Sequence, residues 1–193
     1  MAVSVAISEG FNGKGIEISK TARAFASKYL NVELYGWPLE TFVLENKAKF
    51  DVVSFFGVLE HLTNPVEMLE ISNRLLRKNG IVVLQVPNYD SLSTYIQKLD
   101  RVTDRHLDPT QHIMMFTLES AKYILRKTGF RPIAVWCYGM DVIELMKYLA
   151  RKDNRFKNSE LNDSLSQNLN ELQYVFDKEM KGDEFLIIGK RIR

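Results

Sequence analysis

Residues 50–65 spell FDVVSFFGVLEHLTNP and join a strand pattern to the start of a helix. The run from Asp51 to Gly57 is almost continuously apolar after its acidic start, which is typical of a strand buried on both faces. Asn64 can cap the helix that follows, Pro65 suits its first position, and Glu67 stands three residues after the cap. A buried strand that leads into a helix is the repeating unit of α/β sheets.

The same alternation continues on both sides of this segment. Upstream, a strand is expected at 13–19, a helix at 21–30 and a short strand at 32–35. Downstream, strands are expected at 81–87, 131–138 and 184–191, with a helix that Thr117 caps and Gly129 ends. Strands that alternate with helices at this spacing predict an α/β domain on a mostly parallel sheet.

The carboxyl ends of these strands are where a ligand is expected, because open parallel sheets bind ligands at that edge, where the strand order reverses. The residues at those ends are Glu17, the run 37–39, the run 55–57 and the chain from Asn88 onward. A carboxylate such as Glu17 offers two acceptor oxygens to the hydroxyls of a ribose. An exposed acid at a helix start, which the helix dipole favours, is the other interpretation of Glu17.

Two segments depart from the alternation. Residues 88–115 form a long connection, and connections of this length are usually functional or contain short helices of their own. Residues 140–181 have apolar side chains at steps of three and four, which predicts helix. We interpret 140–181 as a helical insertion packed on the core, with a lid or a homodimer contact as the alternative.

Composition excludes several classes of protein. The chain has 193 residues, 46% hydrophobic and 26% charged, which suits a single globular domain over 1–193. Its one cysteine, Cys137, excludes an internal disulfide and a multi-cysteine zinc site. The net charge of +2 gives no argument for a nucleic-acid partner. Neither a membrane span nor a signal peptide is visible, so a cytoplasmic protein is expected.

Five motifs in order resemble class I S-adenosylmethionine-dependent methyltransferases, most closely the small-molecule branch that includes quinone-biosynthesis O-methyltransferases. Residues 50–65 match the strand-four region of that family, where an aspartate-led strand runs into L-E-H. The other four are GIEIS with TARAFASKYL (15–30), LLRKNGIVVLQVPN (75–88), QHIMMFTLESAKYILRKTGF (111–130) and GDEFLIIGKR (182–191). The resemblance implies a Rossmann-like, doubly wound fold with an antiparallel last strand, S-adenosylmethionine as cofactor and a small-molecule acceptor.

The resemblance also assigns cofactor contacts to the strand ends. It implies that Glu17, with its neighbour Ile18, holds the ribose. It implies that Trp37, Pro38 and Leu39 flank the adenine, and that Phe55, Phe56 and Gly57 line the methionine portion. Many relatives have an acid or polar group where Gly57 stands, so a backbone contact is implied there. No metal ion is expected.

The acceptor side is expected in residues 88–115, which by resemblance form a lid. Methyl transfer to a hydroxyl requires removal of its proton, and a histidine titrates near working pH. His112 is the candidate catalytic base, with packing or hydrogen bonding in the lid as the alternative, whereas His61 is expected to orient the turn into the helix. Side chains that can contact the acceptor are Tyr89, Tyr95, Arg101, Arg105 and His106; two arginines would suit an anion.

The first strand and acidic G-x-G-x-G loop of the family have no counterpart here. Gly10, Gly13 and Gly15 immediately precede the expected strand 13–19, too late for that loop. The missing strand is central in the family, and each buried backbone group left unpaired costs about 1–3 kcal/mol. We expect the chain to be an N-terminally truncated piece of a longer protein. Direct pairing of the second and fourth strands, or a strand at 2–8 that fills the gap, are the alternatives.

The expected function is transfer of a methyl group from S-adenosylmethionine to a small molecule, driven mostly by alignment of the two reactants. An inactive methyltransferase-like module that binds a partner through 140–181 is the second hypothesis. A nicotinamide-dependent dehydrogenase would also place an acid after the second strand, but the L-E-H and P-N strings argue against it.

Overall fold

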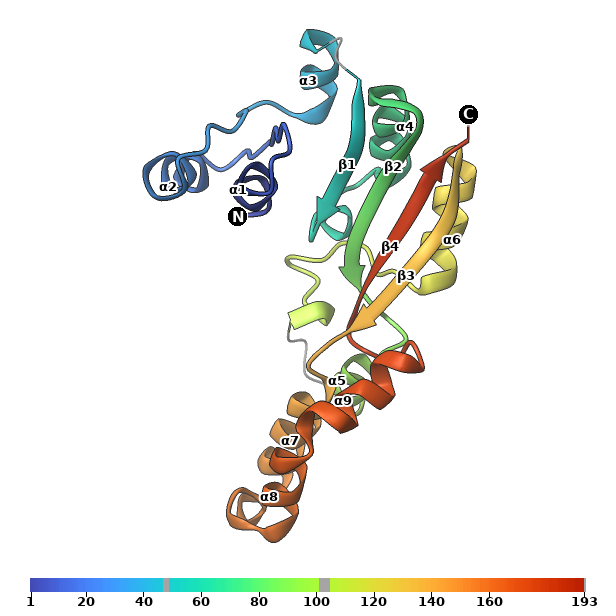
Figure 1. Ribbon diagram of the computed structural model, residues 1–193. Helices are drawn as coiled ribbons and strands as arrows, with labels where there is room; N and C mark the ends of the chain where they lie inside the picture. The colour runs from blue at the N-terminus through green and yellow to red at the C-terminus, as the bar shows by residue number, and fades with distance from the viewer. Residues whose placement is uncertain (47–48, 101–104, 193) are drawn as a thin grey trace. The chain divides into compact units, whose positions relative to one another are not determined.

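The computed structural model describes residues 1–46, 49–100 and 105–192 (Figure 1). The chain divides into two compact units, Met1–Lys49 and Phe50–Arg193. The first unit contains α1 (Ala2–Ser8), α2 (Lys20–Leu30) and α3 (Leu39–Glu45). The second contains, in order, β1 (Phe50–Phe56), η1 (Leu59–His61), α4 (Pro65–Leu75), β2 (Leu76–Pro87), α5 (Leu92–Asp100), η2 (Arg105–Leu107), α6 (Leu118–Lys127), β3 (Phe130–Tyr138), α7 (Asp141–Lys152), η3 (Asn154–Asn158), α8 (Glu160–Gln167), α9 (Leu169–Lys178) and β4 (Glu184–Arg191).

The first unit differs from the sequence expectation in its strands. In place of strands at 13–19 and 32–35, the described residues form one isolated parallel bridge, between Ile16 and Tyr35. The bridge has hydrogen bonds from Tyr35 N–H to Gly15 O and from Glu17 N–H to Tyr35 O, and α2 begins soon after, at Lys20, so the two segments pair too briefly to form strands. Residues 2–8 form helix α1, so the alternative in which they form a strand is wrong.

The second unit confirms the expected mixed α/β fold. Its described residues form a four-stranded sheet in the order β1-β2-β4-β3. β1 and β2 are parallel, and β4 is antiparallel to both of its neighbours, β2 and β3. β1, β2 and β3 therefore share one direction, and the last strand alone runs against them, so the carboxyl ends of three strands meet at one edge.

The core lies on the sheet face that α4 and α6 cover (Figure 1). Val82 pairs with Gly189 and Leu84 with Ile187, and these four side-chain positions share that face. A side chain at Gly189 would be crowded, because a Cβ would lie 3.0 Å from Val82 Cγ1 and 3.1 Å from Leu125 Cδ2 of α6. The close contact shows how tightly α6 packs on the sheet.

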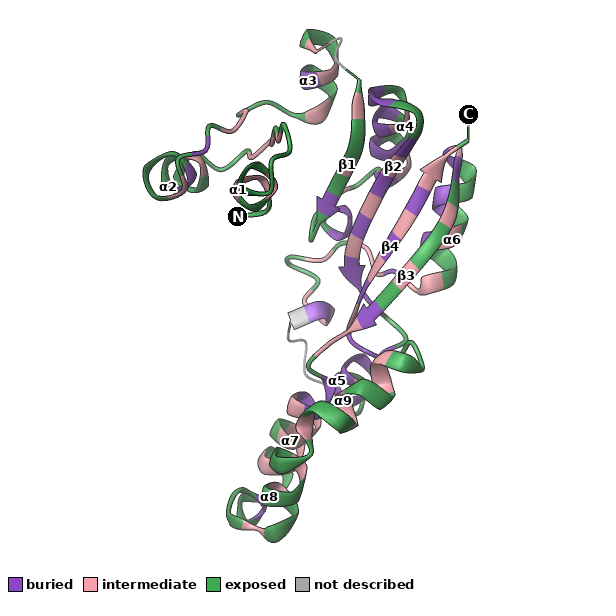
Figure 2. Cartoon of the chain, in the orientation of Figure 1, coloured by how far each residue is buried: buried purple, intermediate pink, exposed green. Residues whose placement is uncertain are grey.

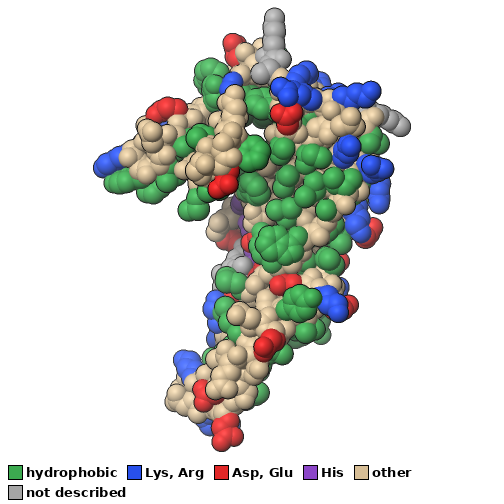
Figure 3. All heavy atoms as spheres, viewed as in Figure 1, with side chains coloured by type: hydrophobic (Ala, Val, Ile, Leu, Met, Phe, Trp, Pro, Cys, Tyr) green, Lys and Arg blue, Asp and Glu red, His purple; other side chains and the backbone are tan. Residues whose placement is uncertain are grey.

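The opposite sheet face is also largely apolar but more exposed. The strands in Figure 2 alternate between buried and less buried residues, the period expected when the two faces differ. Val52 on β1 is 52% exposed and Trp136 on β3 is 64% exposed. Figure 3 shows hydrophobic side chains gathered over the strands on this face.

The expected helix caps are confirmed. Asn64 Oδ1 accepts a hydrogen bond from the Glu67 backbone N–H at 3.3 Å, and Pro65 is the first residue of α4. Thr117 and Ser120 form a reciprocal capping box at the start of α6. Gly129 follows α6 with φ +86°, a backbone conformation that favours glycine.

Residues 140–181 are helical, as the sequence predicts, and α5 supplies the short helix expected within 88–115. α7 packs against both α5 and α9. The buried Asp141 joins these helices to the sheet, because its carboxylate accepts hydrogen bonds from the backbone N–H groups of Ser93 and Asp183, both at 2.8 Å. No helix in the described part of the chain is long and apolar enough to cross a bilayer.

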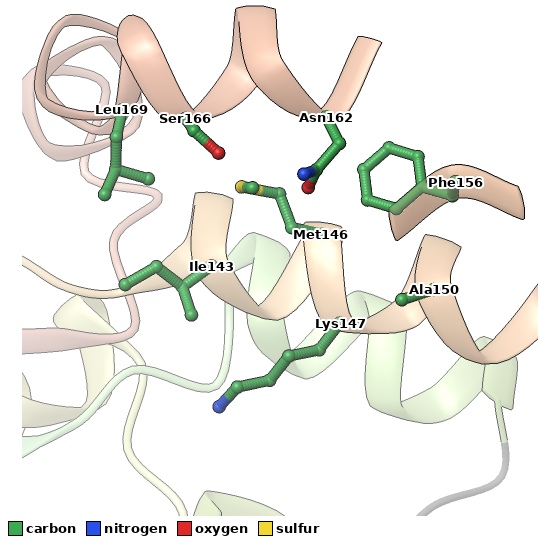
Figure 4. A pocket seen from close by; sticks show the side chains of 8 residues that line it. All are labelled: Ile143, Met146, Lys147, Ala150, Phe156, Asn162, Ser166 and Leu169. Carbon is green, nitrogen blue, oxygen red and sulfur yellow. The ribbon is translucent and has the colours of Figure 1, made fainter. Parts of the chain in front are cut away.

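A hollow of about 330 Å³ lies inside this helical segment, between α7, η3 and α8 (Figure 4). Among the described residues that line it, the one titratable side chain is Lys147, whose Nζ lies 3.0 Å from Glu144 Oε1. Met146 points into the hollow and Lys147 points away from it. The lining is therefore apolar and amide in character and carries no acid–base group directed inward.

Candidate functional site

The carboxyl end of β1 turns sharply into η1. Phe55 is buried, Phe56 is 43% exposed, and Gly57 has φ +62°. The Gly57 backbone N–H donates to Gln85 O of β2 at 3.2 Å, so the turn stays attached to the neighbouring strand. The left-handed φ is the feature that requires glycine at 57, because L side chains disfavour it.

Glu60 lies in this turn and is almost completely buried, with 3% of its surface exposed. Its backbone oxygen accepts a hydrogen bond from Met114 N–H at 3.0 Å, which attaches the 111–116 segment to η1. Burial raises the pKa of the Glu60 carboxyl, and a hydrogen bond from its own backbone N–H, followed by His61 and His112, lowers it by a smaller amount. No described residue is within hydrogen-bonding distance of Glu60 Oε2.

Two histidines face this carboxylate. His61 Nδ1 lies 2.6 Å from Gln111 O, and His112 Nδ1 lies 3.0 Å from His106 O. The rings of His61 and His112 have centroids 4.8 Å apart. One ligand atom from each of Glu60, His61 and His112 lies within 4.8 Å of the others. The cluster can therefore transfer protons or bind a cation.

His106 packs against His112 of this cluster. Its ring is buried and stacks on His112, with centroids 6.0 Å apart and an interplanar angle of 13°. Its Nε2 lies 3.7 Å from Asp183 Oδ2. His106 thus fixes His112 through its ring and its backbone oxygen, and its own ring lies inside the protein rather than at an open acceptor site.

The carboxyl end of β2 is occupied by a structural residue. Asn88 is buried, and its Nδ2 donates to Met180 O at 3.1 Å and Gly182 O at 2.9 Å. Its backbone N–H donates to Asp183 O at 2.8 Å. Asn88 therefore anchors the start of the 88–115 connection to the segment before β4.

Two of the remaining acceptor candidates are exposed tyrosines of the 88–115 connection. Tyr89 carries the Lys98 ammonium over its ring at 3.6 Å, and Tyr95 is 60% exposed. Arg101 lies outside the described residues, as does the side chain of Arg105.

In the first unit, the parallel bridge brings the two expected cofactor segments together. Glu17 N–H donates to Tyr35 O at 2.9 Å, and Glu17 Oε1 accepts from Ser19 N–H at 2.7 Å. Arg23 Nη1 donates to the backbone oxygens of Glu17 and Ile18, and a Cβ at Gly36 would lie 2.8 Å from its guanidinium carbon. The Arg23 guanidinium thus bonds to the 17–18 segment and lies against Gly36 of the other segment.

The adenine candidates follow directly. Trp37 is 45% exposed, and its ring lies 5.7 Å from that of Tyr35 between centroids. Pro38 precedes α3, and Leu39 is its first residue. For the ribose candidate, Glu17 Oε1 accepts a hydrogen bond from the Ser19 backbone N–H, and the residue is half-buried.

Sequence reasoning missed Glu60 and treated His61 and His112 separately. The L-E-H string was visible, but His112 comes 51 positions after His61. The only local signal was the acid beside a histidine at a strand end. The backbone bond from Met114 to Glu60 brings the two histidines together, and it is a tertiary contact.

The family follows from comparison with known proteins. A model of the methyltransferase domain matches residues 4–135. The chain belongs to this methyltransferase-domain family. A search of curated proteins by sequence gives no match.

Solved structures show the same fold for this methyltransferase domain. A methyltransferase from Archaeoglobus fulgidus that depends on S-adenosylmethionine aligns with a TM-score of 0.65 and 18% identity, over 98% of this chain and 80% of that one. A possible histamine N-methyltransferase from Thermotoga maritima gives 0.61 and 14%, over 97% and 76%. The plantazolicin methyltransferase BamL, in complex with a desmethyl-plantazolicin analogue and S-adenosylhomocysteine, gives 0.60 and 15%, over 100% and 73%.

Proposed function

We propose that this methyltransferase-domain protein transfers the methyl group of S-adenosylmethionine to a small-molecule acceptor. The observation that carries the proposal is the family match over residues 4–135. The fold adds support, because the chain aligns with a solved S-adenosylmethionine-dependent methyltransferase at a TM-score of 0.65 over 98% of its length.

The proposed cofactor contacts are the residues that follow the bridge and β1. Glu17 and Ile18 would hold the ribose, and Glu17 keeps one carboxylate oxygen free of the Ser19 cap. Trp37, Pro38 and Leu39 would flank the adenine, for which the exposed Trp37 ring offers a stacking surface. Phe55, Phe56 and Gly57 would line the methionine portion, with Gly57 contributing its backbone.

His112 is the proposed general base. Its Nδ1 lies against a backbone oxygen, which can only accept, so Nδ1 carries the proton and Nε2 has the free lone pair. A hydroxyl acceptor would give its proton to Nε2 while its oxygen attacks the methyl carbon. The C–S bond then breaks, and its electron pair stays on sulfur as the neutral thioether S-adenosylhomocysteine. The acceptor oxygen therefore gains the methyl group and loses one proton.

The test is transfer of labelled methyl from S-adenosylmethionine to a panel of phenols, amines and carbon acids, with extraction of labelled product. Transfer to at least one acceptor is expected. His112→Gln should lower kcat for a hydroxyl acceptor by about 10²–10⁴-fold and leave cofactor affinity unchanged. Glu70→Gln of α4, an exposed side chain outside the cluster, is the control and should leave kcat unchanged. Failure of the whole panel, with cofactor bound, would favour the non-catalytic binding module.

A further inference from the structure

We propose that Glu60, His61 and His112 form a binding site for a divalent transition-metal ion such as Zn²⁺. The site lies at the carboxyl end of β1, where η1 meets the 111–116 segment. It stands independently of methyl transfer, because it predicts binding of the metal alone.

His61 and His112 both have Nε2 as the ring nitrogen that is available to bind a metal ion. Both Nδ1 atoms lie within hydrogen-bond distance of backbone oxygens, Gln111 O for His61 and His106 O for His112. A carbonyl oxygen accepts only, so each Nδ1 must carry its proton. The lone pair is therefore on Nε2 in both neutral rings. Metal-binding histidines are typically oriented in this way by a backbone or carboxylate acceptor on the other nitrogen.

One oxygen of the buried Glu60 carboxylate has no hydrogen-bond partner among the described residues. Glu60 is 3% exposed, and no described residue donates a hydrogen bond to its Oε2. A buried polar atom without a partner is costly, and a buried charge more so. The His61 Nε2 lies 3.9 Å from Glu60 Oε1, beyond hydrogen-bonding range. A cation between the carboxylate and the two rings would satisfy all three groups.

The spacing requires a small movement. The three ligand atoms lie within 4.8 Å of one another, whereas ligand atoms around tetrahedral zinc lie about 3.3 Å apart, given bonds of about 2.0–2.1 Å. The His61 side chain is 42% exposed and can move inward. The Met114 N–H bond to Glu60 O holds the two chain segments together, and both rings are anchored through Nδ1, His112 at His106 O and His61 at Gln111 O, so the inward movement is a turn about these bonds.

The donor set selects the type of metal. Two imidazole nitrogens with one carboxylate suit zinc and other first-row transition metals, whereas magnesium and calcium prefer all-oxygen sites. Three protein ligands leave a fourth position open for water or a substrate oxygen. Metal on His112 Nε2 would exclude the same atom as a base, so the bound and free forms differ in the group that meets the acceptor.

The experiment uses the untagged full chain, stripped with a chelator and titrated with Zn²⁺ by calorimetry. We expect one Zn²⁺ per chain and no measurable binding of Mg²⁺ under the same conditions. Glu60→Gln, His61→Gln and His112→Gln should each weaken Zn²⁺ binding by at least about tenfold. Glu70→Gln of α4, an exposed carboxylate outside the cluster, is the control and should leave Zn²⁺ binding unchanged.

A wild-type measurement covers the case in which a variant does not fold. Nitrogen NMR of the imidazoles should show Zn²⁺ shifting Nε2 of His61 and His112, with both Nδ1 atoms protonated before and after. Absence of Zn²⁺ binding at ligand concentrations up to the millimolar range would overturn the proposal. So would Zn²⁺ affinity that is equal in all three ligand variants and the Glu70→Gln control, or tighter binding of Mg²⁺ than of Zn²⁺.

Discussion

Asp141 connects the helical segment to the sheet, and its removal should be among the most destabilising single changes in the second unit. The side chain is fully buried at 0% exposure. It accepts three hydrogen bonds, from Ser93 N–H and Asp183 N–H at 2.8 Å and from Gln173 Nε2 at 3.0 Å. Gln173 Nε2 also donates to Asp177 Oδ1 at 2.8 Å and so keeps a partner when Asp141 is removed.

Asp141→Ala therefore leaves two buried backbone N–H groups without an acceptor. Each such group costs about 1–3 kcal/mol, so the free energy of unfolding should fall by about 2–6 kcal/mol. Asp141→Asn keeps one acceptor oxygen and replaces the other with a donor, so it should cost about 1–3 kcal/mol. Whole domains are stable by only about 5–15 kcal/mol, so the Ala variant should lose a large part of the total.

The assay is equilibrium urea unfolding of wild type, Asp141→Ala, Asp141→Asn and Asp90→Ala. Asp90 is the control, because it is an exposed aspartate on the 88–115 connection that also contains Ser93. The expected order of loss is Ala, then Asn, with Asp90→Ala close to wild type. Amide exchange should also speed up at Ser93 and Asp183. A loss below about 1 kcal/mol for Asp141→Ala, equal to that of Asp90→Ala, would show that the Ser93 and Asp183 N–H groups do not depend on Asp141 as their acceptor.

Three further outcomes follow from single residues. Burial raises the pKa of the Asp141 carboxyl, so the folded state binds this proton more tightly than the unfolded state. The free energy of unfolding should therefore fall as pH rises from about 3.8 through the raised pKa. Urea unfolding at a series of pH values should show this fall, and the fall should be smaller in Asp141→Asn. Burial also raises the pKa of the Cys137 thiol to about 11, so a thiol reagent at neutral pH should label the native chain far more slowly than the urea-unfolded chain; equal rates would contradict the burial of Cys137. Gly57→Ala should lower the free energy of unfolding by about 1–2 kcal/mol through its left-handed φ of +62° alone, because the new Cβ meets Glu60 Oε1 at an ordinary 3.5 Å; an unchanged urea midpoint would contradict this.

The elements with strong local signals were predictable from the sequence. β1 and α4 follow from an apolar run, a capping asparagine and a proline, and β4 was expected at the residues it occupies, 184–191. The strand expected at 13–19 does not form, and the sequence could not show this, because an extended pattern becomes a strand only when a partner pairs along it. Here the pairing is limited to Ile16 and Tyr35.

The candidate site divides in the same way. Glu17 and the 55–57 run stand out because they end strand patterns, a position that sequence alone can assign. The Glu60 cluster depends on His112, which reaches His61 only because Met114 N–H bonds to Glu60 O. No periodicity or motif spacing encodes that contact, so the cluster could be found only in the folded chain.

We propose that this methyltransferase domain binds S-adenosylmethionine, and calorimetry with S-adenosylhomocysteine measures that binding. We expect one molecule bound per chain. Glu17→Ala should weaken the affinity at least about tenfold, since it removes the proposed charged acceptor of the ribose hydroxyls. Glu9→Ala, an exposed acid in the same unit, should leave the affinity unchanged. No heat of binding with millimolar ligand, from a chain shown to be folded by circular dichroism, would contradict the claim.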